Sequence, residues 1–151
     1  MIRLSRQSDY GVLLLGLFAK APRGTILSCR DLVEQSHLAA PMVAKVLKLL
    51  TRGGILKSVR GIHGGYSLTR SPEQISVGCI IEALEGPVSV TDCAPRESQH
   101  LCAQERWCPV KSSWRRLNDA IFLALNRVTL AEMTCPVGDP VGAFNGQSAT
   151  R

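Results

Sequence analysis

A glycine-rich turn between two short strand-like runs is the feature that most limits the fold of this chain. Residues 61–65 read Gly-Ile-His-Gly-Gly and lie between the runs 55–60 and 66–69. Glycine reaches positive φ without steric cost, so the chain can reverse direction within a few residues. The segment is therefore predicted to form a β-hairpin.

Three segments with helical spacing come before this hairpin. In the first, apolar residues recur at steps of three and four over 10–21, before a proline and a glycine. Ser28 and Asp31 form a capping box for the second. The third has Pro41 at its predicted first position, where a fixed φ suits a helix, and ends at the glycine pair 53–54. Three helices and a hairpin predict a winged helix-turn-helix.

The rest of the chain predicts two more helices. Ser76 caps one that reaches Glu85, and apolar residues from Trp114 to Ala131 alternate steps of three and four, as in a coiled-coil seam. The protein is thus expected to be mainly α. We divide it into a winged helix-turn-helix domain 1–70, a connecting helix 71–87, a cysteine loop 88–109, a long helix 110–133 and a disordered tail 134–151.

The amino terminus carries no targeting signal that we recognise. Its apolar run, 12–18, is interrupted by Gly16 and is much shorter than the roughly 20 residues of a membrane helix. We therefore expect a cytoplasmic protein with no membrane partner. In that compartment thiols stay reduced, so the six cysteines favour metal ligands or reactive groups over disulfides.

The positive charge belongs to the first half of the chain. Residues 1–70 hold eleven Lys or Arg against three acids, a net charge of +8, while the remainder holds seven against nine, a net charge of −2. This asymmetry favours a polyanion-binding domain joined to a different unit. A solvated basic surface without a partner is the alternative.

The predicted third helix separates apolar from basic residues. In a helix-turn-helix, the amino end of the second helix reaches base edges in the major groove, and flanking cations hold phosphates. We therefore expect base contacts from Pro41, Met42 and Lys45, and phosphate contacts from Lys48, Arg52 and Lys57. Any helix with a solvated basic face would show the same pattern.

The hairpin adds a second DNA contact. It places Arg60 beside a flexible tip, where a guanidinium could enter the narrow, electronegative minor groove, and His63 lies in the same turn. A glycine-rich turn could also cradle a nucleotide phosphate, but the Gly-Lys-Ser/Thr ending of such loops is absent. The double-stranded operator is therefore the expected partner.

Three cysteines, Cys93, Cys102 and Cys108, lie in the loop 88–109. A loop of this length in a small domain needs a restraint, which thiolates bound to a metal would supply. Structural zinc generally uses ligand pairs two to four residues apart, and this loop has none. An iron-sulfur cluster, zinc and ordinary free thiols all remain open from the residues alone. Cys29 and Cys79 are expected to be small buried residues, and Cys135 to be incidental.

The combined motifs resemble the IscR/NsrR family of winged-helix regulators, and within it the regulators of iron-sulfur assembly operons. The resemblance covers about residues 1–133: the opening 1–5, the wing 59–66, the three-cysteine loop and the long helix. It implies a homodimer joined through the carboxy-terminal helix. It also implies that Cys93, Cys102 and Cys108 hold a [2Fe-2S] cluster, the form we favour, or a [4Fe-4S] cluster, and that Arg60 is a wing contact.

The fourth cluster ligand is open because the chain departs from the family pattern. Lys111 stands where some members have a histidine, and the first two cysteines are more widely spaced than is common. Other members use an acid from helix one of the opposite subunit, which matches Asp9 here. That residue could equally be a charge favoured by the helix dipole. His37 is a further candidate.

The resemblance implies a transcription regulator, not an enzyme, that senses iron-sulfur, redox or nitric oxide status and controls iron-sulfur assembly genes. Cluster gain, loss or oxidation would change the angle between two winged helices in the dimer. A zinc-bound or thiol-based regulator without iron is the alternative. An iron-sulfur electron carrier would leave the basic winged helix unexplained, and the three scattered histidines suggest no acid-base site.

Overall fold

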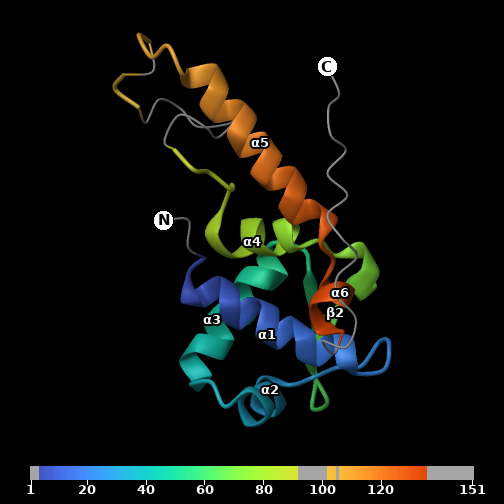
Figure 1. Ribbon diagram of the computed structural model, residues 1–151. Helices are drawn as coiled ribbons and strands as arrows, with labels where there is room; N and C mark the ends of the chain where they lie inside the picture. The colour runs from blue at the N-terminus through green and yellow to red at the C-terminus, as the bar shows by residue number, and fades with distance from the viewer. Residues whose placement is uncertain (1–3, 92–101, 105, 136–151) are drawn as a thin grey trace.

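The computed structural model describes residues 4–91, 102–104 and 106–135, and these are mainly helical, with one small antiparallel sheet. The predicted mainly α winged-helix fold is confirmed (Figure 1). In chain order the elements are α1 (Arg6–Lys20), α2 (Cys29–Ser36), α3 (Ala40–Arg52), β1 (Leu56–Val59), β2 (Gly65–Leu68), the 3-10 turn η1 (Pro72–Gln74), α4 (Val77–Glu85), α5 (Lys111–Arg127) and α6 (Leu130–Thr134).

Side-chain caps fix the starts of the first two helices. The Ser5 hydroxyl accepts from the backbone N–H groups of Gln7 and Ser8 at the start of α1. At α2 the capping box is present, since Ser28 Oγ accepts from Asp31 N at 3.1 Å and Asp31 Oδ2 accepts from Ser28 N at 2.8 Å. These contacts satisfy amides that have no partner inside the helix.

Helix α3 begins one residue earlier than predicted. Ala39 is its N-cap and makes no side-chain cap bond, so Pro41 occupies the second helical position. The Ala39 carbonyl accepts from Met42 N at 2.9 Å and from Val43 N at 3.1 Å. Proline is tolerated at either place because the first amides of a helix have no intrahelical acceptor.

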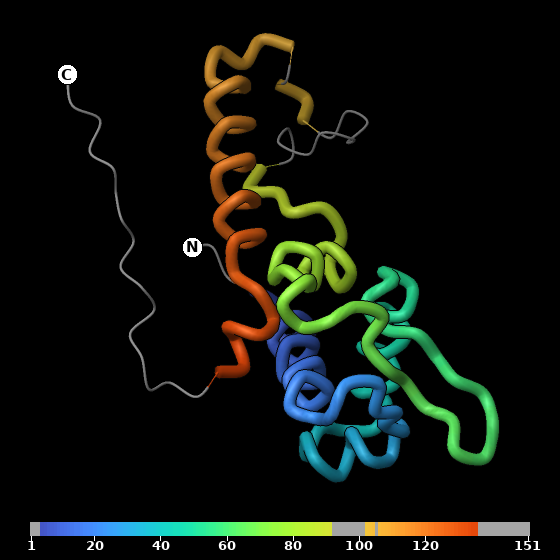
Figure 2. The backbone as a smooth tube through the Cα atoms, turned by 90° about the vertical axis from the view of Figure 1, so that its right-hand side faces the viewer, coloured from blue at the N-terminus to red at the C-terminus, as the bar shows by residue number. Residues whose placement is uncertain are grey.

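The hairpin forms as predicted, with strands slightly shorter than the two runs in the sequence. Leu56 pairs with Leu68 and Val59 with Gly65 in an antiparallel register. Leu27, ahead of α2, forms an isolated bridge with Tyr66, with N···O distances of 3.0 and 2.9 Å. Strand β2 of the wing is therefore attached to the segment before α2, and the tip of the wing extends from the body (Figure 2).

The core lies where α1, α3 and α4 meet, and α6 covers it from the side of α1. Leu14, Val46, Leu50, Ile80 and Leu130 are all fully buried there. Apolar burial on this scale is the main stabilising contribution to a small domain. The winged helix and α4 therefore form one packed unit.

The predicted long helix over 110–133 is instead two helices. It breaks at Val128 and Thr129, where Thr129 and Glu132 form a capping box for α6. Val128 O accepts from Val77 N at 2.9 Å, and Thr129 forms an isolated bridge with Ser76. Pairing with the segment before α4 outweighs continuation of the helix, and α6 turns back onto α1.

Helix α5 projects from this packed unit (Figure 1). Its one buried residue is Asn118, whose Oδ1 accepts from Val90 N at 3.2 Å. Trp114, Leu117 and Leu123 are 38%, 45% and 60% exposed. None of the described helices is both long and apolar enough to cross a membrane.

Candidate nucleic-acid interface and cysteine loop

Helix α3 buries one face and exposes the other. Val43, Val46, Leu47 and Leu50 are fully buried, which fixes the rotation of the helix about its axis. The three basic residues predicted to contact DNA, Lys45, Lys48 and Arg52, are all exposed. The structure therefore presents these cations on one surface, as a groove-binding helix requires.

The two other residues of α3 that were predicted to contact DNA lie at its amino end and differ in exposure. Pro41 is exposed, whereas Met42 is half-buried and packs against the core. Apolar contact with the core leaves less of the Met42 side chain for a base edge. Lys57, on the exposed face of β1, lies outside α3 and is exposed as expected.

The wing tip is exposed and tightly turned. Arg60 and His63 are both exposed, and Gly64 N donates to Gly61 O at 2.9 Å to close the turn. Gly61 has a φ of +125°, which a side chain would strain. Ile62 is 99% exposed at this tip. Ile62 was not among the residues predicted to contact DNA, although its position in the glycine turn could have indicated it.

His37 occupies the turn of the helix-turn-helix. It is exposed, it is the one non-glycine residue with positive φ in the described chain, at 57°, and it ends α2. Its backbone N–H donates to Val33 O at 3.0 Å. These features give His37 a role in the turn, and none of them brings it to a cysteine.

Asp9 lies in the first turn of α1, where a carboxylate suits the helix dipole. It is exposed, and it lines a cavity of about 730 Å³ between α1, α4 and α6. Leu4, Val12, Ile81 and Met133 give this cavity an apolar wall. Asp9 therefore borders a space large enough to receive a polypeptide segment.

The described cysteines of the loop lie directly before α5. Cys102 and Cys108 are half-buried, and Cys93 lies outside the described residues. Within the described part of the chain, no group of three or more His, Cys, Asp or Glu could hold a metal ion. Trp107, next to Cys108, is 81% exposed.

These two cysteines are far from the wing in the same chain. Figures 1 and 2 both place the segment that precedes α5 at the outer end of that helix, and the wing at the opposite end of the molecule. Within one chain, this segment therefore lies apart from the DNA-binding surface.

The remaining cysteines show no sign of a shared site. Cys29 is half-buried and packs against the core, Cys79 is half-buried on α4, and Cys135 is exposed after α6. None of the cysteines in the described residues is in a disulfide. Cys29 and Cys79 were expected to be small buried residues, and the structure shows both of them half-buried.

A single carboxylate joins the amino end of α1 to the carboxyl end of α4. Glu85 Oε1 accepts from Ser5 N at 3.3 Å and Ser5 Oγ at 2.7 Å, and also from Ser8 Oγ. The hydrogen bond from Ser8, followed by those from Ser5, lowers the pKa of Glu85 below its ordinary value. Glu85 therefore stays ionised at neutral pH.

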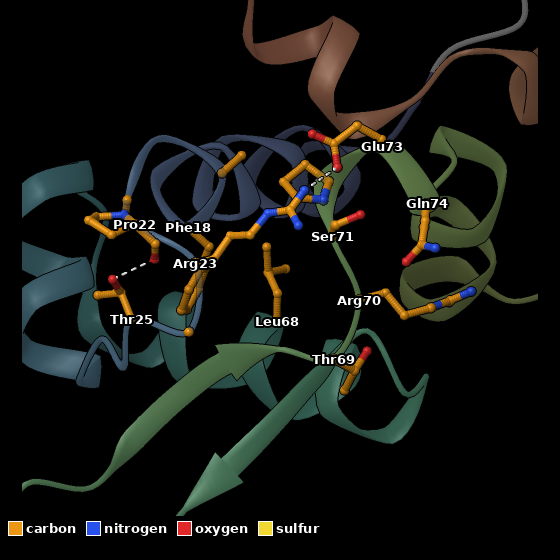
Figure 3. A pocket seen from close by; sticks show the side chains of 14 residues that line it. Phe18, Pro22, Arg23, Thr25, Leu68, Thr69, Arg70, Ser71, Glu73 and Gln74 are labelled. Atoms are coloured by element: carbon orange, nitrogen blue, oxygen red, sulfur yellow. Dashed lines mark hydrogen bonds and ion pairs between the residues drawn. The ribbon is translucent and has the colours of Figure 1, made fainter.

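A second cavity, of about 500 Å³, lies between the loop after α1 and the segment after β2 (Figure 3). Arg23 reaches across it toward Glu73, with an N···O distance of 3.5 Å. Both side chains are mostly exposed, at 81% and 61%, so this ion pair adds little stability. None of the residues predicted from the sequence to bind DNA or a cluster lines this cavity.

The arrangement defines the class of protein. A helix-turn-helix with an exposed basic recognition helix and an exposed wing is the architecture of a winged-helix, DNA-binding transcription regulator. The chain belongs to the Rrf2 family, described as iron-dependent transcriptional regulators, whose sequence model matches residues 4–136.

Individual relatives agree with this assignment. The regulator IscR of Pectobacterium atrosepticum is 31% identical over 133 residues, which cover 87% of this chain and 79% of IscR. The structure of CymR, the global cysteine regulator of Bacillus subtilis, is similar with a TM-score of 0.65 at 27% identity, covering 89% of this chain and 97% of CymR. The structure of IscR from T. potens gives a TM-score of 0.63 at 30% identity, covering 87% and 85%. These relatives are transcription regulators and not enzymes.

Proposed function

We propose that this protein is a homodimeric regulator whose operator affinity depends on an iron-sulfur cluster held by Cys93, Cys102 and Cys108. The observation that carries the proposal is the position of Cys102 and Cys108, half-buried in the non-helical segment that leads into α5. We further propose that it acts in the cytoplasm and controls genes for iron-sulfur assembly, as its resemblance to IscR-type regulators suggests.

The DNA contacts follow from exposure and charge. Lys45 and Pro41 would meet base edges at the amino end of α3, with a smaller contribution from the half-buried Met42. Arg60 and His63 would follow the minor groove through the wing. Phosphates would be held by Lys48, Arg52 and Lys57.

The donor set suits an iron-sulfur cluster. Thiolates are the usual ligands of such clusters, and the loop supplies three of them without the close pairs of structural zinc sites. A bound [2Fe-2S] cluster, or a [4Fe-4S] cluster, would supply redox sensitivity and a covalent restraint on the loop. Cys102 and Cys108 would then fix the start of α5.

A homodimer would complete the site. Trp114 and Leu117 belong to an apolar seam on α5 that the chain itself leaves partly exposed, and a second copy would cover it. Asp9 of one subunit would then be the fourth ligand of its partner's cluster. Its exposure and the adjacent cavity support this assignment, because the partner's loop could enter there.

A thiol-based regulator without iron is the second candidate function. It is favoured by the similarity to CymR, which is named for cysteine regulation. In that case Cys102 and Cys108 would respond by oxidation, and no metal would be needed.

Anaerobic purification tests the proposal. The wild-type protein is expected to be coloured and to contain iron and sulfide, and Cys102→Ala is expected to remove both. Cys135→Ala, in the exposed residue after α6, is the matched control and should keep the cluster. A colourless protein with one zinc rejects the cluster. A metal-free protein whose operator affinity changes on thiol oxidation supports the second candidate.

A further inference from the structure

The side chain of Glu85 joins the carboxyl end of α4 to the amino end of α1. It accepts hydrogen bonds from Ser5 and Ser8, which are 80 and 77 positions away in the sequence. Beside it, Gln7 Nε2 donates to Leu84 O at 2.5 Å. The first turn of α1 is thus held by the last two residues of α4, through both a carboxylate and a backbone carbonyl.

The two helix ends that Glu85 joins each lie next to residues of the proposed cluster site. On one side, Gly86 ends α4 with a φ of +89°, and the chain continues into the cysteine loop. Val90 N then donates to Asn118 Oδ1 of α5 at 3.2 Å. On the other side, Ser8 is next to Asp9, and both residues line the cavity of about 730 Å³.

Helix α1 cannot move independently of the DNA-binding unit. Leu14 and Leu15 are fully buried in the core that α1 shares with α3. A Cβ atom at Gly11 would overlap Leu84 Cδ1, so α1 and α4 are in close contact at this point. A displacement at the end of α4 would therefore be passed to α1, and through it to the recognition helix.

We propose that Glu85 is a positioning residue that couples the start of the cysteine loop to the first turn of α1. Through Ser5 and Ser8 it holds Asp9 in place and transmits the state of the loop to the winged helix. The assignment rests on the proposed function. Because Glu85 is itself exposed and lies outside the apolar core, its loss should disturb this coupling more than the fold.

Hydrogen exchange tests the link in the full-length, cluster-free protein. Glu85→Ala should speed exchange of amides 5–9 by roughly fivefold to tenfold, the effect of one or two lost hydrogen bonds. Glu85→Gln keeps an acceptor oxygen and should restore slow exchange. Glu82→Ala, on the same helix, is the control, since Glu82 is exposed and outside the contacts to α1. Unchanged exchange in Glu85→Ala overturns the proposal.

Operator binding tests the transmission. The ratio of the operator Kd of cluster-loaded protein to that of protein stripped by a chelator should fall toward one in Glu85→Ala. It should stay near the wild-type ratio in Glu85→Gln and Glu82→Ala. Ser8→Ala removes one donor without a change of charge and should give an intermediate ratio. A wild-type ratio in Glu85→Ala overturns the coupling.

The hydrogen-exchange and operator-binding experiments distinguish failure of the proposed function from failure of the role of Glu85. Wild-type protein without iron contradicts the proposed function, and the exchange result then decides by itself whether Glu85 holds α1. Wild-type protein with a cluster and a Kd ratio different from one supports the proposed function. Equal ratios in Glu85→Ala and wild type would then reject only the role of Glu85.

Discussion

Arg60 illustrates how a single residue depends on its local geometry. It follows β1 at the base of a turn in which Gly61 takes a φ of +125° and Gly64 N donates to Gly61 O. The attachment of Tyr66 to Leu27 fixes the wing to the helix-turn-helix. The guanidinium is therefore exposed on a turn with a defined direction, as a groove contact requires.

Replacing Arg60 by Ala should weaken operator binding by about 1–3 kcal/mol, the usual contribution of a specific side-chain contact. Lys48→Ala should weaken binding to all DNA sequences. It should also reduce the magnitude of the slope of log K against log salt concentration by about one, because one phosphate contact is lost. Binding titrations at several salt concentrations measure both effects. Arg127→Ala, on α5, removes one charge away from the wing and α3 and is the control. Wild-type affinity of Arg60→Ala at every salt concentration rejects the wing contact.

At the scale of elements, α1 is held to α4 and α6 by two glycines with different surroundings. A Cβ at Gly11 would overlap Leu84, which is only 4% exposed in the core. A Cβ at Gly16 would meet Thr134 Cγ2 at 3.4 Å, an ordinary van der Waals distance. The two positions therefore differ in packing, although both are helical.

Gly11→Ala should lower the free energy of unfolding by about 1–3 kcal/mol, because the core must shift to admit a methyl group. Gly16→Ala should raise it by about 0.4–1 kcal/mol, because alanine loses less backbone entropy on folding. Urea denaturation of both variants measures the difference. Equal stabilisation by the two substitutions would show that α1 and α4 are further apart than the structure places them.

In the whole molecule, the described segment before α5, which contains Cys102 and Cys108, and the wing lie at opposite ends (Figure 1). The exposed apolar residues of α5 lie between these ends. Dimerisation through α5 would bring a second DNA-binding unit into the assembly, so that two half-sites could be bound together. Loop and operator would then communicate through the dimer and through the α4–α1 contact.

Leu117→Asp should convert the proposed dimer into a monomer, because a carboxylate would be buried in the apolar seam at a cost of several kcal/mol. Leu117 is 45% exposed in the isolated chain, so the fold itself should tolerate the change. Sedimentation measures the mass, and operator binding should weaken in parallel. Ser113→Asp, exposed on the same helix, is the control. A variant that stays dimeric would exclude this seam as the interface.

Local signals in the sequence were enough for most of the winged helix. The Ser28–Asp31 capping box, the Ser76 cap and the glycine turn each act through neighbours a few residues away, so their structural outcomes could be read directly. The exposed cations of α3 followed from helical spacing in the same way. Periodicity failed at Thr129, because the bridge to Ser76 that ends α5 is a contact between distant segments.

Local sequence was enough for the starts of α2 and α4, the hairpin and the separation of basic from apolar residues on α3, because backbone capping and side-chain periodicity act over a few residues. Three contacts depend on the folded arrangement of distant segments: Asn118 Oδ1 accepts from Val90 N, Met42 packs against the core, and Glu85 Oε1 accepts from the hydroxyls of Ser5 and Ser8. Each of these contacts joins residues whose separation in the sequence carries no information about their distance in space. They form because the packed core of α1, α3 and α4 brings those segments together.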